Sequence, residues 1–263
     1  MDTMTHTVLH LGLDPASQLF GVCWFDQSGS PLMPVKYANE VLRSFVTLKS
    51  TKSGKDNRNI RLDELELALR SYIETFPNRY FRCLDWFYSD GKEPPRTWEI
   101  GSIGIEQPSD KFGKDRHDTS YVNGMSARMA YTVCRDYVEG CELSHSRKVK
   151  IHEIMPSESS QNLGLTRGAA KWQRCTMVAT LGGGQYVWPE MNAPNPEDRK
   201  KYAPDGWCEG GLLDGANADA LDAGAAAWSA RHHYINDGLL QLANQSTKKG
   251  QRHDRARRTK QPP

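Results

Sequence analysis

The chain has 263 residues, of which 38% are hydrophobic and 25% are charged, and its formal net charge is +2. These fractions are ordinary for soluble globular proteins, so we expect a packed core and exclude wholesale disorder. No apolar run approaches the roughly 20 residues that span a membrane, and the first residues lack the pattern of a signal peptide. We therefore expect a soluble, cytoplasmic protein without a membrane partner.

The first predicted elements are two apolar strands over residues 8–13 and 19–25, which suggest a hairpin. Apolar residues at helical spacing then predict a helix over 60–76, which Pro77 should stop. An irregular, aromatic-rich segment is expected over 80–98.

The second half of the chain predicts alternating strands and helices. In chain order they are a strand over 100–105, a helix over 122–137, a strand over 149–154, a helix over 172–179 that ends at three glycines, a long loop over 186–213 and an alanine-rich helix over 216–233. A hairpin followed by alternating strands and helices is typical of an α/β fold with a mixed sheet flanked by helices.

Positive charge is concentrated at the C-terminus. After Ser246 there is one acid, Asp254, against seven basic residues: Lys248, Lys249, Arg252, Arg255, Arg257, Arg258 and Lys260. Such a segment buries little apolar surface, so we expect residues 246–263 to form a disordered basic tail. The tail is either an electrostatic tether for nucleic acid or a solubilising extension without a partner.

The six cysteines include no closely spaced pair, which indicates reduced, structural residues. A zinc site formed by Cys141, His145 and His152 is the alternative, but that spacing fits no common zinc template.

Four acidic residues are candidates for a metal site. Asp14 and Glu106 each end a predicted strand, whereas Asp219 and Asp222 lie three residues apart on one face of the last predicted helix. Taken singly, these acids also have ordinary interpretations. Asp14 could be a turn residue, Glu106 a solvated residue at the end of a strand, and the two helix aspartates partners of the helix dipole. Together, converging carboxylates repel one another unless cations bind between them.

Oxygen ligands favour Mg²⁺, and Mn²⁺ can substitute for it. Two such ions would activate a water molecule and stabilise the leaving oxygen of a phosphodiester. The four acids therefore predict a metal-dependent nuclease with two ions per site.

Three motifs carry a resemblance to a known family. They are the LGLDPAS string at 11–17, the IGIEQ string at 103–107 and the NADALDA string at 217–223. Each resembles a motif of the RuvC-type Holliday-junction resolvases, which belong to the RNase H-like nuclease superfamily. A glycine-containing loop and lysine-bearing helix start, over 164–173, also resemble the family.

The resemblance implies an RNase H-like nuclease domain over 1–245, with insertions near 40–98 and 185–213. It implies that Asp14, Glu106, Asp219 and Asp222 bind metal and are catalytic. Lys171 would contact DNA phosphate or the transition state, with Arg167 as a helper. Enzymes of this type are homodimers that nick two opposed strands of a four-way junction.

The loop after Glu106 supplies the remaining DNA-binding candidates. Phe112 would be the wedge that opens the junction, and Lys111, Lys114 and Arg116 would contact phosphates without reading sequence. The chain departs from the family at Ala16, where a glycine is usual, and at Ser160, where a basic residue is expected.

Three other functions stay open. The first is an RNase H-like nuclease that cuts RNA–DNA hybrids or other branched DNA. The second is an actin-like ATPase, whose first strand also carries an aspartate but which needs a further glycine-rich phosphate loop. The third is a protein that binds junctions without cutting them.

Overall fold

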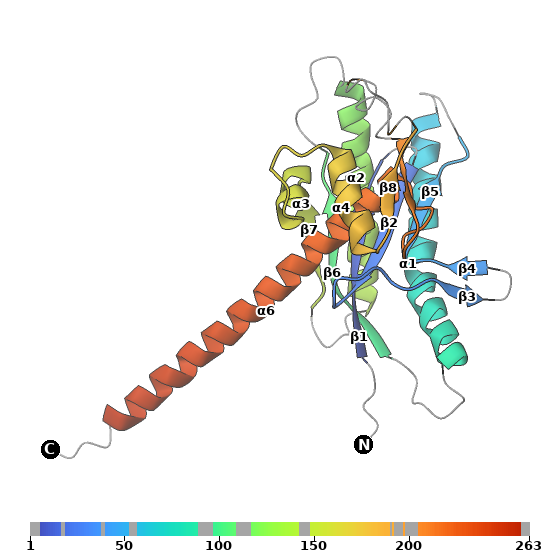
Figure 1. Ribbon diagram of the computed structural model, residues 1–263. Coiled ribbons are helices and arrows are strands. Elements are labelled where there is room, and N and C mark those ends of the chain that lie inside the picture. Colours follow the sequence, from blue (N-terminus) through green and yellow to red (C-terminus); the bar gives the residue numbers. More distant parts are fainter. Residues whose placement is uncertain are drawn as a thin grey trace.

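The computed structural model describes residues 6–16, 19–37, 40–52, 57–88, 97–108, 117–141, 148–189, 191, 197 and 205–258. Its centre is a five-stranded sheet in the order β5-β2-β1-β6-β7 (Figure 1). These strands are β1 (His6–Asp14), β2 (Leu19–Asp26), β5 (Phe45–Lys49), β6 (Thr97–Glu106) and β7 (Lys150–Ile154). The pairs β1–β2 and β2–β5 are antiparallel, whereas β1–β6 and β6–β7 are parallel, so the sheet is mixed.

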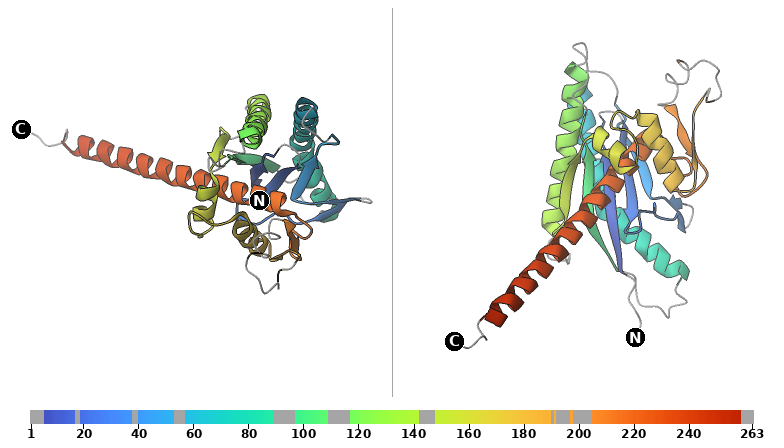
Figure 2. Two further views of the ribbon diagram at one scale, coloured as in Figure 1. Left: turned by 90° about the horizontal axis from the view of Figure 1, so that it is seen from above. Right: turned by 60° about the vertical axis from the view of Figure 1, so that its left-hand side comes forward.

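Helices cover both faces of the sheet, as Figure 2 shows. They are α1 (Arg58–Tyr88), α2 (His117–Cys141), α3 (Pro156–Asn162), α4 (Lys171–Leu181) and α6 (Ala218–Arg258). One buried cluster joins the sheet to α1 and α2, and a second joins it to α4 and the alanines of α6. A mixed sheet between helical layers confirms the predicted α/β class, with helices on both faces of the sheet.

Helix α1 continues through Pro77, so the prediction that the proline stops the helix was wrong. Proline inside a helix removes one hydrogen bond and costs about 3 kcal/mol. Here aromatic rings are stacked on both sides of it, with centroid distances of 5.1 Å for Tyr72–Phe76 and 5.6 Å for Phe76–Tyr80. Burial of these rings offsets the lost bond, and part of the segment expected to be irregular is therefore helical.

The described parts of the segment 40–98, where the resemblance implies an insertion, pack against the rest of the fold. They contribute edge strand β5, which pairs with β2, and helix α1, whose buried side chains join the first cluster. They also complete a small hairpin of β3 (Val35–Tyr37) and β4 (Glu40–Leu42).

The second expected insertion, 185–213, contains a hairpin of β8 (Gln185–Val187) and β9 (Trp207–Glu209) instead of a continuous loop.

The glycines before this hairpin end α4 as predicted. Gly182 caps the helix and Gly183 has a φ of 73°. These glycines follow a helix instead of a strand, so they do not form the phosphate loop that an ATPase requires.

Helix α6 runs far beyond the expected end near residue 233. It continues to Arg258, so the basic segment is helical over 246–258 instead of disordered. Figure 1 shows its C-terminal part projecting away from the body of the protein. None of the helices within the described ranges has an apolar stretch long enough to cross a membrane.

The N-terminal part of α6 lies very close to the sheet because glycines face it. A Cβ added at Gly12, Gly21 or Gly104 would overlap a backbone carbonyl of α6. The facing side of the helix is rich in buried alanines. Small residues on both surfaces bring the backbone of α6 against β1, β2 and β6.

The side chains of five cysteines are described, and all five are buried free thiols: Cys23, Cys83, Cys134, Cys175 and Cys208. This confirms the expectation of reduced, structural cysteines at these positions. His145, part of the alternative zinc site, lies outside the described residues.

Candidate metal centre

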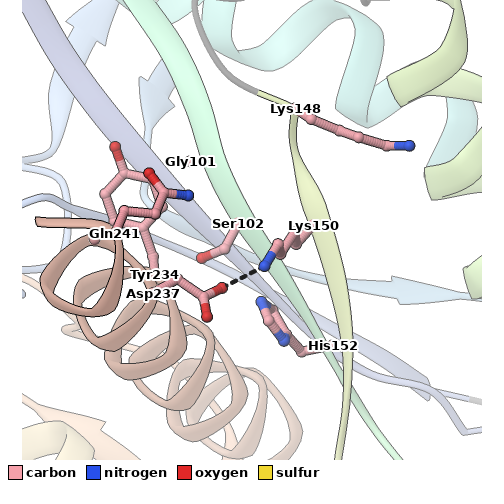
Figure 3. A pocket seen from close by; sticks show the side chains of 9 residues that line it. Gly101, Ser102, Lys148, Lys150, His152, Tyr234, Asp237 and Gln241 are labelled. Carbon is pink, nitrogen blue, oxygen red and sulfur yellow. Dashed lines mark hydrogen bonds and ion pairs between the residues drawn. The ribbon is translucent and has the colours of Figure 1, made fainter. Parts of the chain in front are cut away.

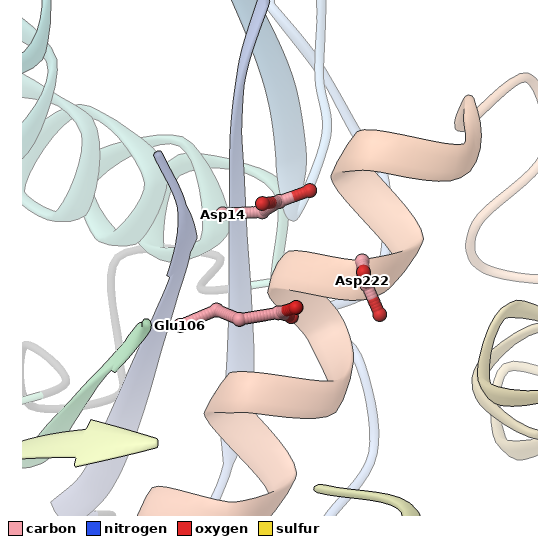
Figure 4. Close-up of side chains that lie close together, drawn as sticks. All are labelled: Asp14, Glu106 and Asp222. Atoms are coloured by element: carbon pink, nitrogen blue, oxygen red, sulfur yellow. The ribbon is translucent and has the colours of Figure 1, made fainter. Parts of the chain in front are cut away.

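Three carboxylates meet at one edge of the sheet. Asp14 is the last residue of β1 and Glu106 the last residue of β6, and these parallel strands pair with Leu13 opposite Ile105. Because the strands are parallel neighbours, both acids leave the sheet at the same end. Helix α6 adds Asp222, and oxygens of the three carboxylates all lie within 4.8 Å of one another (Figure 4).

Asp219 joins this group indirectly. It is not one of the three acids within 4.8 Å, but it shares a cation with two of them, Asp14 and Asp222. Lys171 Nζ lies 2.8 Å from Asp14 Oδ2, 2.8 Å from Asp219 Oδ1 and 3.5 Å from Asp222 Oδ2. The first residue of α4 therefore places an ammonium group among the predicted metal ligands.

Arg174 is a second cation in the cluster, and the sequence analysis missed it. Its Nε donates to Asp222 Oδ1 at 2.7 Å, and its Nη2 donates to Asp222 Oδ2 at 2.7 Å and to Glu106 Oε1 at 3.3 Å. The residue is 5% exposed. Its spacing of three from Lys171, which puts both on one helix face, was the available signal.

Burial and crowding disfavour the charged forms of two of the acids. Burial raises the pKa of Asp14 to about 6; Lys171 lowers this pKa, whereas Asp222 and Asp219 raise it. Burial, Asp222 and Asp14 raise the pKa of Glu106. The pKa of Asp222 is lowered, because Lys171 and Arg174 outweigh its burial.

The residues present fit a divalent metal ion. The donors are carboxylate oxygens, which Mg²⁺ and Mn²⁺ prefer. Glu106 Oε2 is buried and has no hydrogen-bond partner among the described residues. An unpartnered buried carboxylate oxygen is costly, and a bound cation would remove that cost. In the described part of the chain, Asp14, Glu106 and Asp222 form the one group of three or more possible ligands close enough to share an ion.

The acids line a cleft of about 950 Å³. Arg167 and Lys171 also line it, which places two of the predicted DNA-binding residues beside the carboxylates. Lys171 has 33% of its side chain exposed, so it is accessible from the cleft. The other four predicted contacts, Lys111, Phe112, Lys114 and Arg116, lie outside the described residues.

A second, smaller pocket of about 180 Å³ lies between β6, β7 and the middle of α6 (Figure 3). An ion pair of 2.6 Å between Lys150 and Asp237 crosses it. Asp237 is fifteen residues after Asp222 on the helix, or roughly 22 Å along its axis. This pocket is therefore separate from the acidic cleft.

No protein-family model matches the chain, and no curated protein matches it either. Solved structures do align with it. RuvC of Thermus thermophilus has 14% identity and a TM-score of 0.42, covering 87% of this chain and 95% of that chain. The T. thermophilus RuvC complex with a Holliday junction substrate has 13% identity and a TM-score of 0.43, with coverages of 88% and 95%.

The yeast mitochondrial Holliday junction resolvase Ydc2 aligns with 14% identity and a TM-score of 0.39, covering 90% of this chain and 86% of that chain. Resolvases of the type that the sequence motifs resemble are thus among the structures similar to this chain.

Proposed function

We propose that this protein is a divalent-metal-dependent endonuclease that cuts branched DNA, with the four-way junction as its substrate. The observation that carries the proposal is the carboxylate triad of Asp14, Glu106 and Asp222, which lies beside a partly exposed lysine in an open cleft. An acidic cluster with a basic residue at its mouth suits a phosphodiester, since the metal and the lysine both attract phosphate oxygens.

Asp14, Glu106 and Asp222 would hold Mg²⁺, or Mn²⁺ in its place, with Asp219 beside them. Bound metal would supply an activated water molecule and stabilise the leaving oxygen. Lys171 bridges Asp14 and Asp219 and is 33% exposed, so it can donate a hydrogen bond to a phosphate that enters the cleft. Arg167, exposed on the same cleft, would hold the DNA backbone.

The choice of a four-way junction comes from the sequence motifs around Asp14, Glu106 and Asp222. These motifs also direct us to a homodimer, because two opposed strands are nicked symmetrically only if two copies of the site act on one junction. Such an activity would serve recombination or repair of DNA, in the nucleoid or cytoplasm of a cell.

Incubation of the purified protein with an end-labelled mobile four-way junction tests the proposal. We expect paired, symmetric nicks with Mg²⁺ or Mn²⁺ and none with EDTA. Cleavage of an RNA–DNA hybrid but not of the junction would show that the protein is a nuclease for hybrids instead of junctions. Junction binding without any metal-dependent nick would identify a non-catalytic binding protein and overturn the proposal.

A further inference from the structure

We propose that the pocket between β6, β7 and α6 is a second phosphate site, which holds the backbone of a DNA arm outside the acidic cleft (Figure 3). The site rests on the proposed function, because it would hold the substrate that the cleft cuts. The residues that would bind phosphate are Lys148, Lys150 and His152, which line this pocket and do not line the cleft.

The pocket is an open recess at the place where α6 begins to project from the body of the protein (Figure 1). Gly101 and Gly238 are among its lining residues. A Cβ added at Gly238 would meet nothing within 4 Å, so the helix leaves room there. Strand β7 lies at the edge of the five-stranded sheet, so the lysines at its start are not covered by a further strand of that sheet.

Two lysines and an imidazole supply hydrogen-bond donors for an anion. Lys148 is exposed and Lys150 has 56% of its side chain exposed, so DNA can reach both ammonium groups. His152 Nε2 is buried and has no hydrogen-bond partner within the described part of the chain. Burial, followed by the charge of His233, lowers the pKa of His152 to about 4, so the ring is neutral near pH 7 and one of its nitrogens can donate. A phosphate oxygen would accept from this nitrogen and remove the cost of leaving it unpaired.

Asp237 occupies the position on Lys150 that a phosphate oxygen would take. Its Oδ2 accepts a hydrogen bond from Lys150 Nζ at 2.6 Å, and Figure 3 shows this contact crossing from α6 to β7. Carboxylate and phosphate oxygens both accept charge-assisted hydrogen bonds from an ammonium group. Because this ion pair is exposed to solvent, it is weak enough for a phosphate to replace the carboxylate. Asp237 is therefore a competitor of the DNA backbone for Lys150.

The place of the pocket along α6 suits a DNA arm that begins at the cleft. Asp237 lies roughly 22 Å from Asp222 along the helix axis, which corresponds to about six or seven base pairs of a duplex. The basic residues of the C-terminal segment come farther along the same helix, which continues to Arg258. The cleft, the pocket and the basic segment thus follow one another along a single helix, and each can hold the backbone of the same arm.

Binding of a four-way junction, measured by mobility shift in EDTA at several salt concentrations, tests the site. Lys148→Gln and Lys150→Gln should each lower the affinity about fivefold or more and reduce the slope of log affinity against log salt by about one, because a phosphate contact is lost. Lys36→Gln is the control. Lys36 is an exposed lysine of β3, and Figure 1 shows β3 on the side of the molecule opposite the projecting helix. Losses no larger than that of the control would overturn the proposal.

Asp237→Asn should have the opposite effect and raise the affinity about threefold or more, because it frees Lys150 and removes a charge that repels phosphate. Asp63→Asn is its matched control, since it removes the same charge from an exposed position on α1. If the ion pair only stabilised the fold, loss of either partner would weaken binding alike. A gain no larger than that of Asp63→Asn would therefore overturn the proposal.

Uncharged methylphosphonates locate the contact on the DNA. Placed at about the fifth to the ninth phosphate from the centre of the junction in all four arms, they cover the distance from the cleft to the pocket. They should weaken binding by the unaltered protein and have a much smaller effect on Lys148→Gln, which has already lost the contact. Equal losses in both proteins would place the contact elsewhere and overturn the proposal.

Cleavage separates failure of this site from failure of the proposed function. In Mg²⁺ and with saturating junction, Lys148→Gln and Lys150→Gln should reach the maximal rate of the unaltered protein and differ only in KM, because the pocket is remote from the acids. If the junction is cut and no variant changes its affinity, the nuclease stands and the second phosphate site is overturned. If the unaltered protein neither binds nor cuts the junction, both are overturned.

Discussion

Gly12 of β1 lies against the backbone carbonyl of Ala223 in α6, with no room for a Cβ between them. Asp14 is two residues after this glycine, and Asp222 is one residue before the alanine. The contact therefore fixes the distance between two of the three carboxylates that could share an ion. A single hydrogen atom in place of a side chain sets the geometry of the candidate metal centre.

Gly12→Ala should therefore destabilise the protein and weaken the metal site together. Overpacking a tight contact typically costs about 1–3 kcal/mol, and here the obstacle is backbone, which cannot rotate away. Urea unfolding with and without Mn²⁺ measures both effects. We expect a lower free energy of unfolding and a smaller stabilisation by Mn²⁺.

Gly124→Ala is the control for this substitution. Gly124 lies inside α2, and a Cβ there would meet nothing within 4 Å. Alanine in a helix is favoured over glycine by about 1 kcal/mol, so this variant should be slightly more stable. A Gly12→Ala protein as stable as Gly124→Ala would show that the close approach of α6 is not required.

Much of this arrangement could be predicted from the sequence, because the relevant signals are local. Asp14 and Glu106 follow short apolar runs, and a residue that ends a buried strand comes to the sheet edge. Asp219 and Asp222 are three apart in an alanine-rich run, which indicates a closely packed helix face. The α/β class follows from the order of these elements.

Other features depend on contacts between distant residues, for which the sequence holds little local signal. Pro77 is tolerated inside α1 because aromatic rings from the same helix are buried against the sheet. Arg174 looks like an ordinary exposed helical arginine, and only the fold brings it to Asp222, forty-eight residues away. The edge strand β5 is short and half-buried, so its alternation was too weak to predict.

The two strand-end acids should be required for cleavage but not for DNA binding. Asp14→Asn and Glu106→Gln keep the shape of each side chain and remove its charge, so we expect cleavage of a four-way junction in Mg²⁺ to fall at least about 100-fold. Binding, measured by a mobility shift in EDTA, should be retained. Retained cleavage with lost binding would contradict these roles.

His10 should make the folded state sensitive to acid. Burial, followed by the charge of Arg231, lowers its pKa from 6.5 to about 3, and its Nδ1 lies 2.8 Å from Ser102 Oγ. The unfolded chain binds a proton below about pH 6.5 that the folded protein excludes, so this stability is complete above that pH and is lost progressively toward pH 3. The expected loss from His10 is about 2 kcal/mol between about pH 7 and pH 5.

Urea unfolding of the unaltered protein and of His10→Gln at both pH values isolates this contribution, because the other titrating groups are common to both. The variant should show a shallower decline in the free energy of unfolding toward acid pH. Equal slopes would mean that His10 does not titrate differently in the two states.

The basic extension should contribute salt-dependent DNA affinity. Seven positive charges after Ser246 release counterions when they approach phosphates. Deletion of residues 247–263 should therefore reduce the slope of log affinity against log salt, with the largest loss, about tenfold or more, at low salt. A variant with the seven basic residues changed to glutamine separates charge from length. An unchanged slope in both would show that the segment does not contact DNA.

Because the candidate metal centre needs Asp222 of α6, it can form during protein synthesis only after the start of α6 has been made. Asp14 and Glu106 are translated early, but their glycine-bearing strands gain the covering helix only after residue 217 has been made. Until the ribosome has released the start of α6, one face of the sheet is only partly covered. Asp14 and Glu106 are then present without Asp222. The protein therefore becomes competent to hold a metal ion only after the first turns of α6 have been made and released.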